Sequence, residues 1–127
     1  KAGATEMMAA LDELGLPFGL ATSSRRPWVE RHFSAHGLTR RFAAVVTRQD
    51  VINGKPDPEP YAKASQLLGA APMHVLATED SHAGVRPAHG AGCMTVMVPD
   101  LLAADEEMHA KAHVVASLHE ARALLGD

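Results

Sequence analysis

Short apolar runs alternate along the chain with longer stretches in which apolar residues recur every three or four positions. The short runs are typical of buried strands, and the longer amphipathic stretches are typical of helices. Strands are predicted at 17–21, 42–47, 74–78 and 95–98, and helices at 5–14, 27–36, 60–68, 83–91 and 118–125. Strands separated by helices of this length need crossover connections, which build a parallel sheet with helices on both faces. The sequence therefore predicts an open α/β fold.

Composition and charge narrow the class of protein. The 127 residues carry a net charge of −3, with 46% apolar and 21% charged residues, as in an ordinary soluble domain. The basic residues are scattered apart from two short pairs, so no footprint for nucleic acid or an anionic membrane is expected. No apolar stretch approaches the roughly 18 residues of a membrane span, and the first residues lack the pattern of a signal peptide. We expect a cytoplasmic protein that binds small molecules.

The single cysteine, Cys93, cannot form a disulfide within the chain. This fits a reducing compartment. Because Cys93 lies in a stretch of small residues, a buried and inert thiol is expected rather than a reactive one.

Polar residues follow three of the predicted strands. Thr22 closes the first apolar run, Lys55 lies just before Pro56 and Pro58 in a loop after the second, and Glu79-Asp80 follows the third. Ligands of open parallel sheets bind outside the carboxyl ends of the strands, so these residues form one candidate site. A cation and a pair of carboxylates suit chemistry on phosphate, because the cation binds the anion and the carboxylates bind a metal.

Three segments occur in an order that resembles a known family. Residues 20–25, 53–58 and 78–86 are similar to the second, third and fourth motifs of the haloacid dehalogenase superfamily. The likeness is to its magnesium-dependent sugar-phosphatase and β-phosphoglucomutase branch. It covers nearly the whole chain, because residues 1–3, 91–92 and 98–100 also resemble the family.

The resemblance implies a Rossmann-like core domain over residues 1–127 and a function for it. It implies a magnesium-dependent phosphatase of a small phosphorylated metabolite, such as a sugar phosphate, that works through an aspartyl-phosphate. A phosphomutase of the same family is an open alternative. The resemblance assigns catalytic roles to Thr22 and Lys55, phosphate or substrate binding to Ser23, Ser24 and Arg25, and Mg²⁺ binding to Glu79 and Asp80.

One part of the family's pattern has no counterpart in the 127 residues. The first motif, with the nucleophilic Asp and the general acid, and the helical cap domain after it are not found. In the family the corresponding strand is central, between the strands that end here at Thr22 and Thr78. Its loss would leave unpaired backbone groups that each cost about 1 to 3 kcal/mol when buried. We therefore expect this segment alone not to fold as a monomer unless a partner strand or a missing N-terminal segment fills the gap.

Simpler roles are open for several of these residues. Thr22 could cap its own turn, Asp80 could cap the helix after Ser81, and Arg25 could be a solvated loop residue. His82 could contact substrate or belong to the first turn of that helix. The pairs His32/His36 and His109/His113 have a spacing that can bind a metal, but no third ligand recurs nearby, and metal binding by them is not expected.

Two other classes of function use a similar fold. A phosphorelay receiver domain shares the fold and uses an Asp, a Thr and a Lys, but its acidic pair follows the first strand. Here the acids come after Thr22 and Lys55, which argues against a receiver. A non-catalytic relative that kept the fold and lost the nucleophile remains open. The dehalogenase branch replaces the acidic pair, so Glu79-Asp80 argues against that activity.

Overall fold

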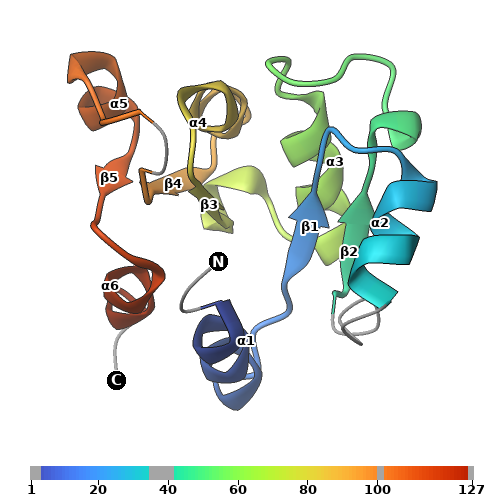
Figure 1. Ribbon diagram of the computed structural model, residues 1–127, viewed down its shortest axis with the longest axis horizontal. Coiled ribbons are helices and arrows are strands. Elements are labelled where there is room, and N and C mark those ends of the chain that lie inside the picture. Colours follow the sequence, from blue (N-terminus) through green and yellow to red (C-terminus); the bar gives the residue numbers. More distant parts are fainter. Residues whose placement is uncertain (1–3, 35–41, 100–101, 126–127) are drawn as a thin grey trace.

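The computed structural model describes residues 4–34, 42–99 and 102–125 (Figure 1). Helices and strands alternate along most of the chain, as the sequence pattern predicted. The elements are α1 (Ala4–Glu13), β1 (Gly19–Ala21), α2 (Arg26–Ser34), β2 (Ala44–Val46), α3 (Glu59–Leu68), β3 (Leu76–Glu79), α4 (His82–Gly90), β4 (Met94–Met97), α5 (Glu106–Lys111), β5 (His113–Val114) and α6 (Leu118–Ala123). Two short 3₁₀ helices, η2 (Arg48–Asp50) and η3 (Pro72–His74), precede α3 and β3.

Every predicted strand and helix is present, with ends that shift by up to two residues. The predicted strand 74–78 starts two residues later, at Leu76, because His74 closes the η3 turn. The end of the predicted helix 27–36 falls outside the described residues. The sequence pattern missed α5 and β5, which together cover the stretch before the last helix.

The strands form two parallel sheets rather than one. Strand β1 pairs with β2, while β3 pairs with β4 and β4 with β5. Within the described ranges, no strand pairs with the second edge of β1 or of β3. The predicted α/β fold with parallel strands is confirmed. The two sheets are separated from each other between β1 and β3, which is where the family resemblance implied a central strand.

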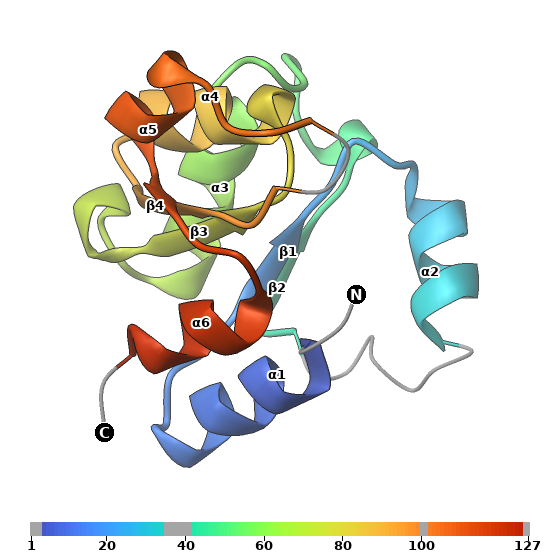
Figure 2. The ribbon, with the colours of Figure 1, turned by 60° about the vertical axis from the view of Figure 1, so that its left-hand side comes forward.

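The three-stranded sheet is covered on both faces, as predicted. Val96 and Val98 cluster on one face with Ala121 of α6, whereas Met97 packs on the other face with Met108 of α5. This alternation follows from the two-residue period of a strand. Figure 2 shows α4 and α5 on one side of β3 and β4, and α1 and α6 on the other.

Helix α3 links the two sheets. Its Tyr61 packs with Ala77 of β3 and Ala88 of α4, and Ala21 of β1 packs against the same cluster. Cys93 belongs to this cluster too, and its burial raises the pKa of the thiol, as expected of an inert cysteine. The cluster fixes the carboxyl end of β1 near that of β3. None of the described helices has the length and apolar character needed to cross a membrane.

Candidate active site

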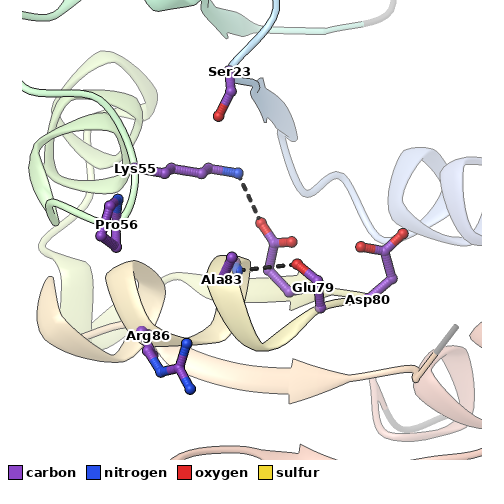
Figure 3. Close-up of a pocket in the computed structure, with 9 residues that line it drawn as sticks. Ser23, Lys55, Pro56, Glu79, Asp80, Ala83 and Arg86 are labelled. Carbon is purple, nitrogen blue, oxygen red and sulfur yellow. Dashed lines mark hydrogen bonds and ion pairs between the residues drawn. The ribbon is translucent and has the colours of Figure 1, made fainter. Parts of the chain in front are cut away.

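A cavity of about 410 Å³ opens where the carboxyl ends of β1 and β3 approach the loop before α3 (Figure 3). Four of the seven predicted site residues line it, from three separate segments of the chain. The lining residues are Ser23, Lys55, Pro56, Glu79, Asp80, Ser81, Ala83, Gly84 and Arg86. The predicted convergence of Ser23, Lys55 and the acidic pair is therefore present in the structure.

Lys55 joins the ends of the two sheets. Its Nζ lies 3.0 Å from Oε1 of Glu79 at the end of β3 and 3.3 Å from the carbonyl oxygen of Ala21 at the end of β1. The ammonium also lies 5.0 Å from the centre of the Tyr61 ring, within range of a cation–π interaction. These contacts hold the Lys55 ammonium at the carboxyl ends of β1 and β3, in the cavity, where an anion could meet it.

Glu79 is largely withdrawn from water. Only 13% of its side chain is exposed, and this burial raises the pKa of its carboxyl group although Lys55 and the amide of Asp80 favour the ionised form. Its carboxylate lies against Gly84 in the first turn of α4, and a Cβ added to Gly84 would overlap it. Gly84 therefore makes room for Glu79 to reach Lys55.

Asp80 follows Glu79 but lies in a different environment. It is exposed, and in Figure 3 its carboxylate points away from Lys55, whereas that of Glu79 points toward Lys55. The residue that caps α4 is Ser81, whose Oγ accepts a hydrogen bond of 3.1 Å from the amide of Gly84. Asp80 is thus not the cap of this helix, and the simpler role considered for it is wrong.

The acidic pair fits Mg²⁺ in the chemistry of its donor atoms. Carboxylate oxygens are the ligands that Mg²⁺ prefers, and the ion often takes only one or two from the protein and keeps several waters. In the parts of the chain that the structure describes, no group of three or more His, Cys, Asp or Glu side chains could hold a metal. Glu79 and Asp80 therefore offer two ligands of the right kind, one of which already contacts Lys55.

The loop after β1 presents Thr22 and Ser23 differently. The Thr22 amide extends the β1–β2 pairing by donating to the carbonyl of Val46, and Thr22 Oγ1 accepts a hydrogen bond of 3.1 Å from the Ser24 amide. Thr22 therefore does cap its own turn, yet its hydroxyl hydrogen is still available to donate to another acceptor. Ser23 is exposed and lines the cavity, and in Figure 3 its hydroxyl points toward Lys55.

Three predicted site residues, Thr22, Ser24 and Arg25, are not among those that line the cavity. Ser24 serves the turn through its amide and its carbonyl, which accepts from the amide of Arg48. Arg25 is exposed, and its carbonyl accepts from the amide of Val29 at the start of α2. Their placement supports the shape of the loop, and their roles toward a substrate stay predictions.

Arg86 is a lining residue to which the sequence analysis gave no role. Its guanidinium forms two hydrogen bonds, of 2.8 and 3.0 Å, with the two carboxylate oxygens of Glu107 on α5. A signal was present, because Arg86 is the last residue of the segment 78–86, which resembles the family's fourth motif. Its partner could not be read from the sequence, since α5 itself was not predicted.

His82 has side-chain partners in the segment before α5. His82 Nε2 lies 2.9 Å from the carbonyl oxygen of Ala103, and its Nδ1 lies 3.7 Å from a carboxylate oxygen of Asp105. His82 therefore contacts the segment before α5 from the first turn of α4. His109 belongs to α5 and His113 to β5. The structure does not describe His36 or the side chain of His32.

Comparisons with known proteins agree with this fold. The family described as haloacid dehalogenase-like hydrolase matches residues 1–98. The phosphoglycolate phosphatase of Escherichia coli (strain K12) is 34% identical over 91 residues, which are 72% of this chain and 36% of that protein. The chain spans less than half the length of the curated relatives that it matches.

Two solved structures show the same fold. A haloacid dehalogenase phosphatase from Thermococcus onnurineus matches 99% of this chain and 58% of its own, with a TM-score of 0.87 and 25% identity. A hydrolase of the same family from Deinococcus radiodurans R1, solved with bound phosphate and sodium, matches 98% of this chain and 58% of its own, with a TM-score of 0.84 and 28% identity. The sequence match over more than three quarters of the residues, together with the fold, shows that this chain belongs to the haloacid dehalogenase-like hydrolases.

Proposed function

We propose that the protein is a magnesium-dependent phosphatase of a small phosphorylated metabolite, with a sugar phosphate as the substrate class. One observation carries the proposal: the Lys55 ammonium lies at the carboxyl ends of both β1 and β3, in a cavity that also holds a pair of carboxylates. The phosphatases among its relatives support the reaction class. A cytoplasmic location is part of the same proposal.

Phosphate binding falls to Lys55 and to the loop after β1. Lys55 acts as a point charge on the phosphoryl oxygens, and the Thr22 and Ser23 hydroxyl groups donate hydrogen bonds to the same oxygens. Arg25, exposed beyond the cavity, contacts the more distant part of the substrate, and Ser24 contributes its backbone to the turn. In phosphoryl transfer the charge spreads over three oxygens, so fixed donors of this kind stabilise the transition state.

The metal belongs to the acidic pair. Asp80 is the direct ligand, and Glu79, which Lys55 already holds, contributes through water or by its charge. When bound, Mg²⁺ neutralises charge on the phosphate and so makes attack by an anionic nucleophile easier. Glu79 also keeps the Lys55 ammonium directed into the cavity.

The attacking group in this proposal is an Asp outside these 127 residues. It would enter between β1 and β3, where each strand has an edge without a pairing strand in the described part of the chain. Lys55, which touches the ends of both strands, would then lie between the attacking carboxylate and the phosphate. A lysine at that point lowers the repulsion between two anions that must approach each other.

The test is phosphate release by the complete protein from a panel of sugar phosphates, with and without MgCl₂. Asp80→Ala is expected to abolish magnesium-dependent turnover, because the exposed direct ligand is lost. Glu106→Ala, which removes an exposed acid at the start of α5, is the matched control and should turn over like the wild type. Unchanged turnover in Asp80→Ala would refute the metal assignment, and no release from any phosphate ester would refute the phosphatase.

A further inference from the structure

One carboxylate beside the site gathers three hydrogen bonds on a single oxygen. Oδ2 of Asp50 accepts from the Thr47 amide at 2.7 Å, from Thr47 Oγ1 at 2.8 Å and from Arg26 Nη2 at 2.7 Å. Partial burial alone would raise the pKa of Asp50, but the hydrogen bonds from Thr47 and Arg26 outweigh it and the pKa is lowered. Asp50 lies outside the cavity lining, so the proposed chemistry does not explain this concentration of donors.

The segment that Asp50 organises is bonded to the loop after β1. The Arg48 amide donates to the Ser24 carbonyl at 3.0 Å, and the Arg26 amide donates to Oε1 of Gln49 at 2.8 Å. With the Arg26–Asp50 ion pair, three bonds therefore join residues 48–50 to the turn that presents Thr22. The second end of that turn is fixed by the β1–β2 pairing.

The same segment lies against the loop that presents Lys55. Arg48 donates from Nη1 to the Val51 carbonyl at 3.1 Å, and its Nε is so near Gly54 that an added Cβ there would lie 2.9 Å away. Lys63 of α3 donates to the Asp50 carbonyl and ties the segment to the helix that follows the loop. Residues 47–50 thus contact both phosphate-binding loops of the proposed site.

We propose that Asp50 is a positioning residue that fixes the separation of the Thr22 loop and the Lys55 loop. The inference rests on the proposed function, since it concerns the affinity of that same site for phosphate. Asp50 acts by holding Thr47 and Arg26 on one oxygen, so that η2 keeps a single geometry between the two loops. A tetrahedral anion needs its donors on two sides at once, and it binds more weakly when either loop moves.

The test compares the dissociation constant of inorganic phosphate, measured by calorimetry with MgCl₂ present, in the complete wild-type protein and its variants. Asp50→Ala is expected to weaken phosphate binding by about tenfold or more, and Asp50→Asn by less because its amide oxygen can still accept. Glu120→Ala is the matched control. It also removes a carboxylate that accepts from a backbone amide, that of Ala116, but on α6. Its phosphate affinity should stay within about twofold of the wild type.

Two outcomes with Asp50→Ala would overturn the inference. In one, Asp50→Ala unfolds at a lower urea concentration than the wild type yet binds phosphate equally well, which would make Asp50 purely structural. In the other, Asp50→Ala binds phosphate more tightly, as expected if Arg26 were itself a phosphate ligand that Asp50 holds back. A wild-type protein that binds no phosphate would overturn the proposed function and this inference together.

Arg26 provides a second route if Asp50→Ala does not fold. Its side chain is 42% exposed, so its replacement removes less buried contact. Arg26→Ala should weaken phosphate binding, and Arg26→Lys should restore part of the loss because an ammonium can still donate to Asp50. Equal binding by Arg26→Ala and the wild type would overturn the positioning role.

Discussion

Two glutamates with cations at similar distances titrate in opposite directions. Glu79 lies 3.0 Å from the Lys55 ammonium and Glu107 lies 2.8 Å from Arg86, yet the pKa of Glu79 is raised and that of Glu107 is lowered to about 2. The two carboxylates differ in their exposure to solvent. Burial outweighs the lysine at Glu79, whereas Glu107 is open to solvent and has hydrogen bonds from Arg86 and Lys111. A nearby cation therefore does not show that a carboxylate is stabilised in its charged form.

The two pairs affect stability in opposite pH ranges. The lowered pKa of Glu107 stabilises the fold above its ordinary value of 4.5, and this contribution is lost as the pH falls from there toward about 2. For Glu79 the sign is reversed, because the folded state holds the proton more tightly than the unfolded state does. Its ionisation costs nothing below 4.5 and costs progressively more as the pH rises through the raised pKa. A buried group held against its preference is typical of a functional site.

The largest effect is expected from Lys55→Met, with Lys111→Met as the matched control on the exposed pair. Without Lys55, Glu79 keeps a buried carboxylate with no cation at Oε1, which should cost up to about 3 kcal/mol of unfolding free energy near neutral pH. Phosphate release should also fall to background. Lys111→Met leaves Arg86 on Glu107 and should change the urea midpoint far less.

The pH dependence sharpens this first prediction. The stability lost in Lys55→Met should shrink as the pH is lowered, because Glu79 can then take up a proton and become neutral. Urea unfolding at several pH values measures it. A loss that is the same at acid and neutral pH, or equal losses in the two Lys→Met variants, would contradict the burial argument.

A smaller effect is expected when the geometry of the buried pair is disturbed and its charges are kept. Gly84→Ala places a methyl group where the Glu79 carboxylate lies, so Glu79 must move away from Lys55. Overpacking costs about 1 to 3 kcal/mol, and the lower end of this range is expected because the added Cβ meets the end of a side chain that can shift. The control is Gly90→Ala in the same helix, where the new Cβ would lie 3.6 Å from Pro58, an ordinary contact. Alanine there should be neutral or stabilising by up to about 1 kcal/mol, and thermal unfolding separates the two variants.

Some features of the fold and of the candidate site could be predicted from the sequence, and others could not. That Lys55 and Glu79-Asp80 line one cavity could be predicted, because each follows an apolar strand and the strand ends of a parallel sheet share one edge. Thr22 also follows such a strand but does not line the cavity. The fold class could be predicted because most of the strands and helices show a clear apolar run or period. Helix α5 and strand β5 could not, because β5 has only two residues and α5 has a single buried residue, Met108, so neither shows an apolar period.

Contacts between residues far apart in the chain could not be predicted for a different reason. The overlap between Gly84 and Glu79 depends on how α4 returns to the end of β3, and the bond between Arg26 and Asp50 joins residues 24 positions apart. Neither has a local signature. The division of the strands into two sheets was implied only by the family resemblance, because periodicity predicts strands and not which strands pair.

The smallest effect is expected from a change in the more exposed ion pair, at Glu107. Glu107→Gln removes the charge that Arg86 and Lys111 share and should lower the thermal midpoint slightly near neutral pH. The difference from the wild type should vanish as the pH falls below 4.5 toward about 2, because the wild-type side chain then loses its charge and is neutral, like that of Gln. Midpoints measured across that range check it, and added salt should reduce the neutral-pH difference because both partners are open to solvent. A difference that grew on acidification would mean that Glu107, like Glu79, is stabilised in its protonated form, and the contrast drawn between the two pairs would fail.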